Sequence, residues 1–208
     1  MEQMFDSLKT LIDSELPKAA AAVGEPESKV SRAVPAILSG ILAKLTNKGA
    51  TASVESALRE GEKTPILTQL DTIFGGKASR EQEAVGNKLI QAIMGGKAGE
   101  FTAAISNYSG VSQSSSNKLT AMVSTVVAGF LGNQLSTGNT KAFNLLGDLR
   151  KEKSHFAAKI PSGVQSALGL SNQYIFDSNT KQNKKGGLLV WLTLSVALVL
   201  LLVFGINS

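Results

Sequence analysis

The chain has 208 residues, with 21 Lys and Arg against 16 Asp and Glu, a formal net charge of +5, no cysteine and one histidine. Without cysteine there are no disulfides, thiolate nucleophiles or cysteine metal sites, and one histidine cannot build a histidine-rich metal centre. Three lysines and one aspartate follow residue 170, so residues 1–170 carry 18 basic and 15 acidic side chains, which are interspersed. Because nucleic-acid-binding domains concentrate basic charge on one face, we expect no nucleic-acid partner.

The first long predicted helix covers residues 28–47. Apolar residues recur there at steps of three and four, which places them on one face of an α-helix. Pro35 lies inside this pattern and should kink the helix, because proline lacks a backbone N–H. Gly40 lowers helix propensity, and close approach of another helix would compensate for it. The residues expected in the core are Val34, Ile37, Leu38 and Ile41.

Two shorter helices are predicted next. Ser79 and Gln82 have the spacing of a capping box, which indicates a helix from there to about residue 94. A second helix should run over 98–108 and end at Gly110. The Gly-Gly-Lys triplets at 75–77 and 95–97 lack the other residues of a phosphate-binding loop, so we interpret them as helix ends.

A second long helix is predicted at 117–136, with Ser112 as its N-cap. The apolar steps of 28–47 recur there 89 residues later, and Gly129 matches Gly40 while Lys118 matches Lys29. This correspondence predicts an internal two-fold repeat of equivalent helices. The alternative is a coincidence between two ordinary amphipathic helices. The residues expected in its core are Val123, Val126, Val127 and Phe130.

The remainder of the domain also has a helical pattern. An apolar pair followed by glycine recurs at 73–75, 93–95 and 145–147, and each occurrence is expected to end a helix. A last short helix should start at 161–162 and end near Leu168. No segment shows sustained two-residue alternation, so the sequence predicts an all-α, multihelical globular domain over 1–170. Further core positions are expected at Tyr108, Phe143, Leu146, Leu149, Phe156 and Ile160.

An uncharged run at 186–206 predicts a transmembrane helix at 187–206, because about 20 apolar residues rising ~1.5 Å each cross a bilayer core of ~30 Å. The polar stretch 171–186 is expected to be a tether. Lysines beside a span stay on the cytoplasmic side, so residues 1–170 should be cytoplasmic. The acidic first 13 residues do not form a cleavable signal peptide. The residues assigned to the predicted span include Gly187, Trp191, Ser195 and Phe204, and those assigned to its cytoplasmic flank are Lys181, Lys184 and Lys185.

Three phrases resemble the YidB-like family of uncharacterised bacterial helical proteins: VGEPESKVSRAVPAILSGILAKL, GGKAGEFTAAISNYSGVSQSSSNKLTAMVSTVVAGFLGNQL and LLGDLRKEKSHFAAKIPSGVQSALGL. The resemblance covers roughly residues 1–170. It implies a multihelical fold and supplies no catalytic residues. Several relatives resemble envelope proteins in which this domain precedes a membrane helix and an OmpA-like peptidoglycan-binding domain.

These observations favour a non-enzymatic helical interaction or scaffolding protein, anchored in the bacterial inner membrane by a single pass. We expect no catalytic residue, cofactor or metal ion. His155 should be dispensable for any chemistry, because no catalytic or metal-binding motif surrounds it. The expected partners are the lipid bilayer and an unidentified protein. Self-association into a homo-oligomer is expected, with a monomer as the alternative. Two other functions remain open: an envelope linker with an exported peptidoglycan-binding domain, and a small-molecule or lipid-binding domain, which a pocket with convergent polar groups would favour.

Overall fold

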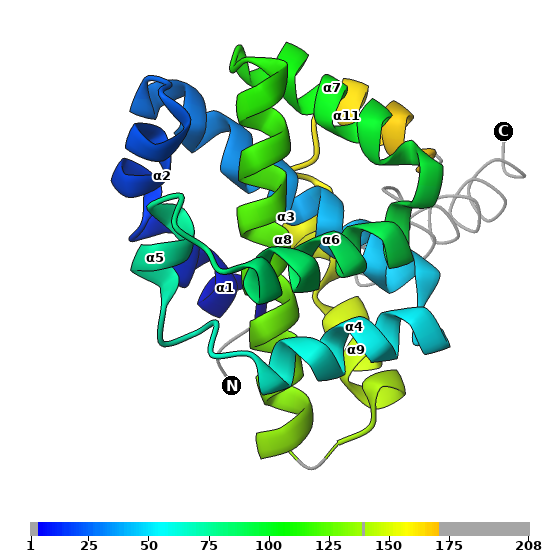
Figure 1. Ribbon diagram of the computed structural model, residues 1–208. Coiled ribbons are helices and arrows are strands. Elements are labelled where there is room, and N and C mark those ends of the chain that lie inside the picture. The colour runs from blue at the N-terminus through cyan, green and yellow to red at the C-terminus, as the bar shows by residue number, and fades with distance from the viewer. Residues whose placement is uncertain (1–3, 139, 171–208) are drawn as a thin grey trace, which may run out of the picture. The chain divides into compact units, whose positions relative to one another are not determined.

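The computed structural model describes residues 4–138 and 140–170, which belong to one compact unit of the chain. Every regular element in this described part is a helix, as the sequence predicts (Figure 1). The elements are α1 (Met4–Asp13), α2 (Leu16–Val23), α3 (Glu27–Lys48), α4 (Ala52–Lys63), α5 (Leu70–Phe74), α6 (Arg80–Met94), the 3-10 turn η1 (Gly95–Lys97), α7 (Ala98–Ser109), α8 (Gln113–Thr137), α9 (Ala142–Lys151), α10 (Lys153–Ala157) and α11 (Ser162–Leu168).

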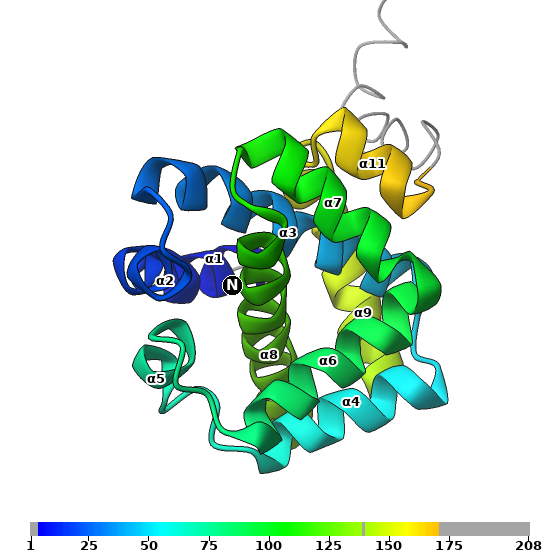
Figure 2. The same cartoon turned by 45° about the horizontal axis from the view of Figure 1, so that its top comes forward.

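Helix α8 runs through the middle of this domain. Figures 1 and 2 show α2 and α5 on one side of α8, α7 and α11 on the other, and α4 and α6 crossing it. Residues 122–132 of α8 are all buried, including its serine and threonine. Other helices surround this stretch of α8, and therefore residues 122–132 are apolar or small almost all round the helix axis, while the first turns of α8 keep exposed polar side chains.

The two long helices lie where the sequence predicts them, since 28–47 falls within α3 and 117–136 within α8. Pro35 lies inside α3, as expected. The neighbours of the matched glycines differ: Gly40 of α3 faces Phe101 of α7, whereas Gly129 of α8 faces Ile66 in the connection after α4. A common origin of the two helices therefore stays a prediction. The eight core residues of the predicted repeat are buried in both helices: Val34, Ile37, Leu38, Ile41, Val123, Val126, Val127 and Phe130.

Glycines allow α4 and α8 to approach until their backbones touch. A Cβ atom placed on Gly61 of α4 would lie 2.5 Å from the carbonyl oxygen of Ala128. A Cβ atom on Gly132 of α8 would lie 2.5 Å from the backbone nitrogen of Glu62 and closer still to the carbonyl oxygen of Leu58. Both distances are below those that Cβ atoms tolerate, so this crossing requires glycine on each helix.

Most of the predicted helix ends are confirmed. Ser79 and Gln82 form the capping box of α6, with hydrogen bonds of 2.8 and 3.3 Å, and Ser112 caps α8 by accepting from Ser115 N–H at 3.1 Å. Gly95 and Gly110 end α6 and α7 with positive φ angles of 55° and 79°, which glycine adopts without steric cost. The local chemistry of caps thus places the helix boundaries.

Three predictions for the domain are wrong. The helix end predicted at 145–147 is absent, and α9 continues to Lys151. Leu149, one turn after Leu145, is buried on the same face, and its burial favours a longer helix. Tyr108 is 41% exposed, and its ring lies beneath the Arg32 guanidinium, 5.4 Å from the ring centroid. Phe143 is 76% exposed, because α9 turns Ala142 and three leucines inward. The other expected core residues are buried: Leu146, Leu149, Phe156 and Ile160.

Among residues 4–138 and 140–170, no helix is both long enough and apolar enough to span a bilayer. The predicted tether at 171–186 and the predicted span at 187–206 lie outside the described residues. The flanking lysines 181, 184 and 185 and the span residues Gly187, Trp191, Ser195 and Phe204 also lie outside the described residues.

Candidate functional site: two adjoining pockets beside α8

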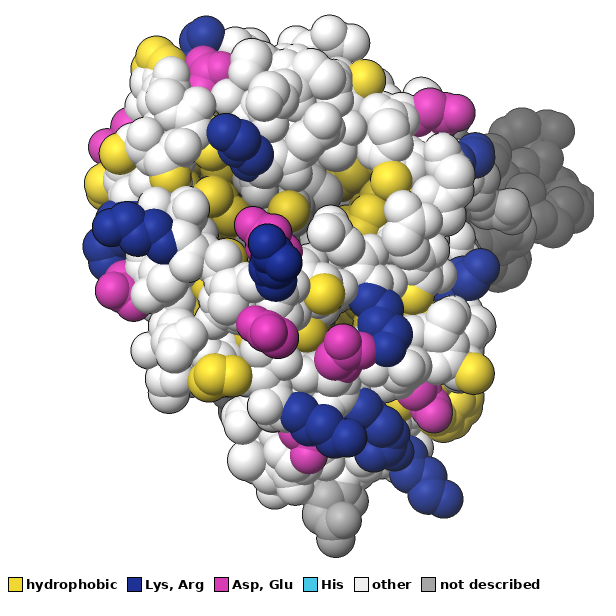
Figure 3. All heavy atoms as spheres, in the orientation of Figure 1, with side chains coloured by type: hydrophobic (Ala, Val, Ile, Leu, Met, Phe, Trp, Pro, Cys, Tyr) yellow, Lys and Arg dark blue, Asp and Glu magenta, His cyan; other side chains and the backbone are white. Residues whose placement is uncertain are grey.

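The face seen in Figure 3 is hollowed, with hydrophobic side chains visible in the hollows and acidic and basic side chains interspersed around them. The larger pocket of the described domain has a volume of about 370 Å³ and lies between α2, the α5–α6 connection, α6 and α8. A smaller pocket of about 230 Å³ lies between α6, α7 and α8. The two pockets share Asn87, Asn117 and Ala121, so they adjoin on one face.

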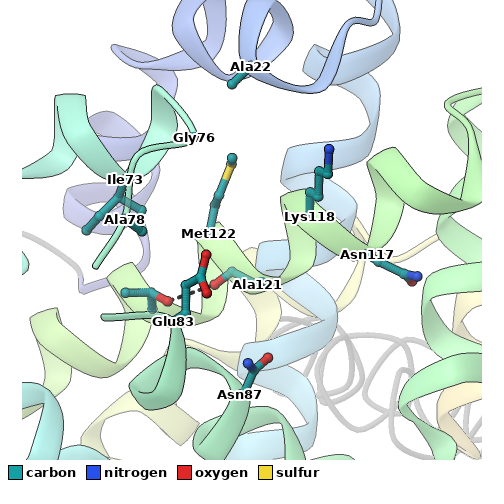
Figure 4. A pocket seen from close by; sticks show the side chains of 11 residues that line it. Ala22, Ile73, Gly76, Ala78, Glu83, Asn87, Asn117, Lys118, Ala121 and Met122 are labelled. Carbon is teal, nitrogen blue, oxygen red and sulfur yellow. Dashed lines mark hydrogen bonds between the residues drawn. The ribbon is translucent and has the colours of Figure 1, made fainter. Parts of the chain in front are cut away.

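Helices α6 and α8 form one wall of the larger pocket. Glu83 and Asn87 lie one turn apart on α6, and α8 contributes Asn117, Lys118 and Met122. In Figure 4 the Met122 side chain points from α8 toward Ala22 of α2, with Glu83 and Asn87 on the other side of the space. Apolar surface and polar groups of both signs therefore meet in this pocket.

A buried contact holds these two helices at a fixed spacing. Thr125 of α8 donates a hydrogen bond to the carbonyl oxygen of Gln82 on α6 at 3.1 Å and to that of Ala121 at 2.9 Å. Gly86 of α6 faces Thr125, and any larger residue there would collide with the Thr125 hydroxyl. The Gln82 side chain is itself buried and donates to Gln69 Oε1 at 2.7 Å, which ties the start of α6 to the start of α5.

The opposite wall contains small and apolar side chains. It is made by Ala22 from α2, Ile73 from α5, and Gly76 and Ala78 from the α5–α6 connection. Gly76 has φ +72°, and a Cβ atom there would lie 3.2 Å from the Ala22 side chain. Substitution at Gly76 would therefore strain the backbone and narrow the pocket.

Glu25 fixes α2 against the beginning of α8. Its carboxylate accepts a hydrogen bond from the Ser112 backbone N–H at 2.6 Å, and Ser115 Oγ donates to the Val23 carbonyl at 3.2 Å. The Ser112 hydrogen bond is the main cause that lowers the pKa of Glu25 below its ordinary value, with smaller contributions from Ser115 and Lys29. The carboxylate also lies at the positive end of the α8 dipole.

The smaller pocket has a neutral lining. Asn87, Gln91 and Asn117 bring amide groups to it, and Ala98 and Gly99 keep the α7 side shallow. The Gln113 side chain, beside this wall, donates to Thr102 Oγ1 at 2.9 Å and to Asn117 Oδ1 at 3.0 Å. Thr120 Oγ1 at the same wall is buried without a hydrogen-bond partner among the described residues. The wall therefore carries an unused hydrogen-bonding group.

The two pockets together offer amide groups, one carboxylate and one ammonium group. Such a surface can hydrogen-bond to neutral polar groups and bury a small apolar one. In the described part of the chain, no cluster of three or more His, Asp or Glu side chains is arranged to hold a metal ion. His155 lies exposed on α10 and lines neither pocket.

The sequence did not identify this site. Of its residues, Met122 belongs to the apolar pattern of the second long helix, and Lys118 is the match to Lys29. Apart from Ile73 and Ile90, the other lining residues are common polar or small side chains, and their grouping depends on how α2, α5, α6 and α7 pack around α8. Asn117 and Lys118, which directly precede the long apolar stretch of α8, are the one available signal of an uncovered strip.

The fold and the site thus define a small all-helical domain organised around α8. A family model described as a bacterial protein of unknown function (DUF937) matches residues 6–134, and the chain belongs to this family. The matched residues include every residue that lines the two pockets. The YidB-like resemblance stays a prediction, since the matching family does not carry that name. No curated protein and no solved structure gives a significant match.

Proposed function

We propose that this protein is a non-enzymatic interaction module, anchored in the bacterial inner membrane by residues 187–206, with its helical domain in the cytoplasm. The proposal that the domain binds a partner is supported by the pair of adjoining pockets beside α8. The membrane part rests on the sequence, because the run at 186–206 contains no charged residue and follows three lysines.

A protein segment fits the chemistry of this face. Asn87 and Asn117 reach both pockets, and a side-chain amide both donates and accepts hydrogen bonds, as a peptide backbone does. Glu83 and Lys118 supply one charge of each sign at the larger pocket. The half-buried alanines of the pocket allow a partner to approach closely, and the flexible Met122 side chain can adapt to apolar contacts. These features support a partner with neutral polar groups and a modest apolar contact.

A second candidate is a small-molecule binding domain, which the larger pocket favours. Its volume of about 370 Å³ falls within the usual range for small ligands, and Glu83, Asn87 and Lys118 converge on it. A ligand for this pocket would be a small polar molecule carrying both an acidic and a basic or amide group, because the lining offers both signs.

Site-specific crosslinking in cells tests the main proposal. A photoreactive residue would replace Asn117 in the full chain, with Ser154 on α10 as the control position, because both side chains are exposed. We expect a discrete protein adduct from position 117, none from position 154, and loss of the adduct in a chain lacking residues 187–206. Equal adducts from both positions, or none from 117, would contradict the proposal.

The second candidate has a different readout. Native mass spectrometry of the full chain released from detergent would show a small bound mass. That mass should disappear in the Asn87→Leu variant and persist in Gln134→Leu on the last turns of α8. A bound mass together with no protein adduct would favour the small-molecule reading over the interaction module.

A further inference from the structure

Two lysines from separate segments meet at the end of α11, and a third lies one turn away. Lys44 of α3 donates a hydrogen bond from Nζ to the Leu168 carbonyl at 3.2 Å. Lys97 of η1 places its Nζ 3.2 Å from where a Cβ atom would stand on Gly169. Lys48 follows Lys44 by one helical turn. We call Lys44, Lys48 and Lys97 the lysine face.

The positive charge of the lysine face is not compensated by ion pairs. The ion pairs found among the described residues involve other lysines, at positions 9, 18, 29, 88 and 151. Burial, followed by repulsion from Lys97 and Lys48, lowers the pKa of Lys44 below its ordinary value. Arg150 adds a nearby cation, since it donates to the Thr46 carbonyl on α3 at 2.6 Å. An anionic partner would relieve this repulsion.

The lysine face lies where the chain leaves the described domain. Leu168 and Gly169, which Lys44 and Lys97 approach, are followed by the polar stretch 171–186 and then by the predicted span. Sixteen residues reach at most roughly 55 Å when fully extended. Any bilayer that holds residues 187–206 is therefore tethered to the domain beside these lysines.

We propose that the lysine face docks on the anionic headgroups of the bilayer that holds the predicted span. The inference rests on the proposed membrane anchor and adds an orientation of the domain to it. Lys48 and Lys97 are exposed and would contact headgroups, whereas Lys44 is half-buried and would act mainly by its charge. Lysines near an anionic surface attract it at short range, and salt screens the attraction.

Lysine acetylation on vesicles tests the orientation. The full chain is reconstituted into vesicles of phosphatidylcholine alone or with one third phosphatidylglycerol, pulsed with N-hydroxysuccinimide acetate, and analysed by mass spectrometry at each lysine. Lys77 serves as the control, because it follows α5, on the side of α8 away from α11 in both ribbon views (Figures 1 and 2). We expect acetylation of Lys48 and Lys97 to slow about fivefold on the anionic vesicles. Lys77 should be unchanged, and high salt should remove the difference.

Variants and flotation separate this inference from the anchor. In flotation, the full chain should favour anionic over neutral vesicles. The double variant Lys48→Gln with Lys97→Gln should remove this difference, and Lys63→Gln with Lys77→Gln should keep it. Equal acetylation of Lys48 and Lys97 on both vesicle types, or equal slowing at Lys77, would overturn the docking face whether or not the chain floats. Failure of the full chain to float with neutral vesicles would contradict the anchor alone, because phosphatidylcholine offers no net charge.

Discussion

At the scale of single residues, glycines in α4, α6 and α8 determine how closely the helices pack. Gly61, Gly86 and Gly132 each face the backbone or a short side chain of a neighbouring helix. Because the opposing atoms are mostly backbone, they cannot rotate out of the way, unlike the Phe101 ring that faces Gly40. The crossing of α4 and α8 therefore depends on residues that carry no functional group.

Replacing Gly132 by Ala should destabilise the domain by about 2 kcal/mol, because the added methyl group forces α4 and α8 apart. The matched control is Gly147→Ala in α9. No atom lies within 4 Å of a Cβ at Gly147, so this change should stabilise the domain by about 0.5–1 kcal/mol through helix propensity. Urea unfolding of the full chain measures both. A neutral effect of Gly132→Ala would show that the helices are not held at backbone contact.

Glu25 should make the stability of the domain depend on pH. Its pKa is lowered in the folded state, so its contribution is present above the unfolded pKa and is lost as pH falls through the folded pKa. We expect Glu25→Gln to be less stable than the natural chain at pH 7 and to converge with it below about pH 4. Glu62→Gln, an exposed change in α4, should not show this convergence. Parallel stability curves for Glu25→Gln and the natural chain would refute the role of the carboxylate.

At the scale of helices, capping residues predicted most of the boundaries, and the apolar pattern predicted the buried faces of the two long helices. The Ser79 box, the Ser112 cap and the ends at Gly95 and Gly110 are local features that the structure has, whereas the helix end predicted at 145–147 is absent. The exposure of Phe143 depends instead on which side of α9 meets the core, and this is set by contacts with distant helices. Helix α1 was not predicted, although Phe5, Leu8 and Ile12 form its buried face.

The capping box of α6 should contribute measurably to stability. Ser79→Ala removes the hydroxyl that accepts from Gln82 N–H and should cost about 1 kcal/mol. Ser114→Ala, within the first turn of α8 but not at its cap, should change the free energy of unfolding by less than about 0.5 kcal/mol. Thermal unfolding compares the two variants. If they lose equal stability, the effect comes from the loss of serine in general and not from the cap.

At the scale of the whole molecule, the sequence predicted an all-helical domain but could not locate its pockets. The pocket walls come from α2, α5, α6, α7 and α8, and most of their lining residues are polar or small side chains that occur on any helix surface. The packing of α6 against α8 brings Asn87 and Asn117 into one site, and α2 and α7 each add a wall to one of the pockets. Tertiary contacts of this kind have no local pattern in the sequence.

Self-association is a further prediction at this scale. Phe143 and Tyr108 are the large hydrophobic side chains that the described domain leaves exposed, and Phe143 is the more exposed of the two. We expect the detergent-solubilised full chain to form an oligomer that Phe143→Ser weakens, because tethering to a membrane raises the effective concentration of a weak contact. Sedimentation with correction for bound detergent measures the mass. A single-chain mass at all concentrations would support the alternative that every apolar face is used within the monomer.

Membrane anchoring is the central claim, and extraction of membranes with alkaline carbonate tests it most directly. Carbonate releases peripheral proteins and leaves proteins with a spanning helix in the pellet. We predict that the full chain stays in the pellet and that a chain lacking residues 187–206 appears in the supernatant. A full chain released by carbonate, or a truncated chain that pellets equally as a folded protein, would contradict the anchor.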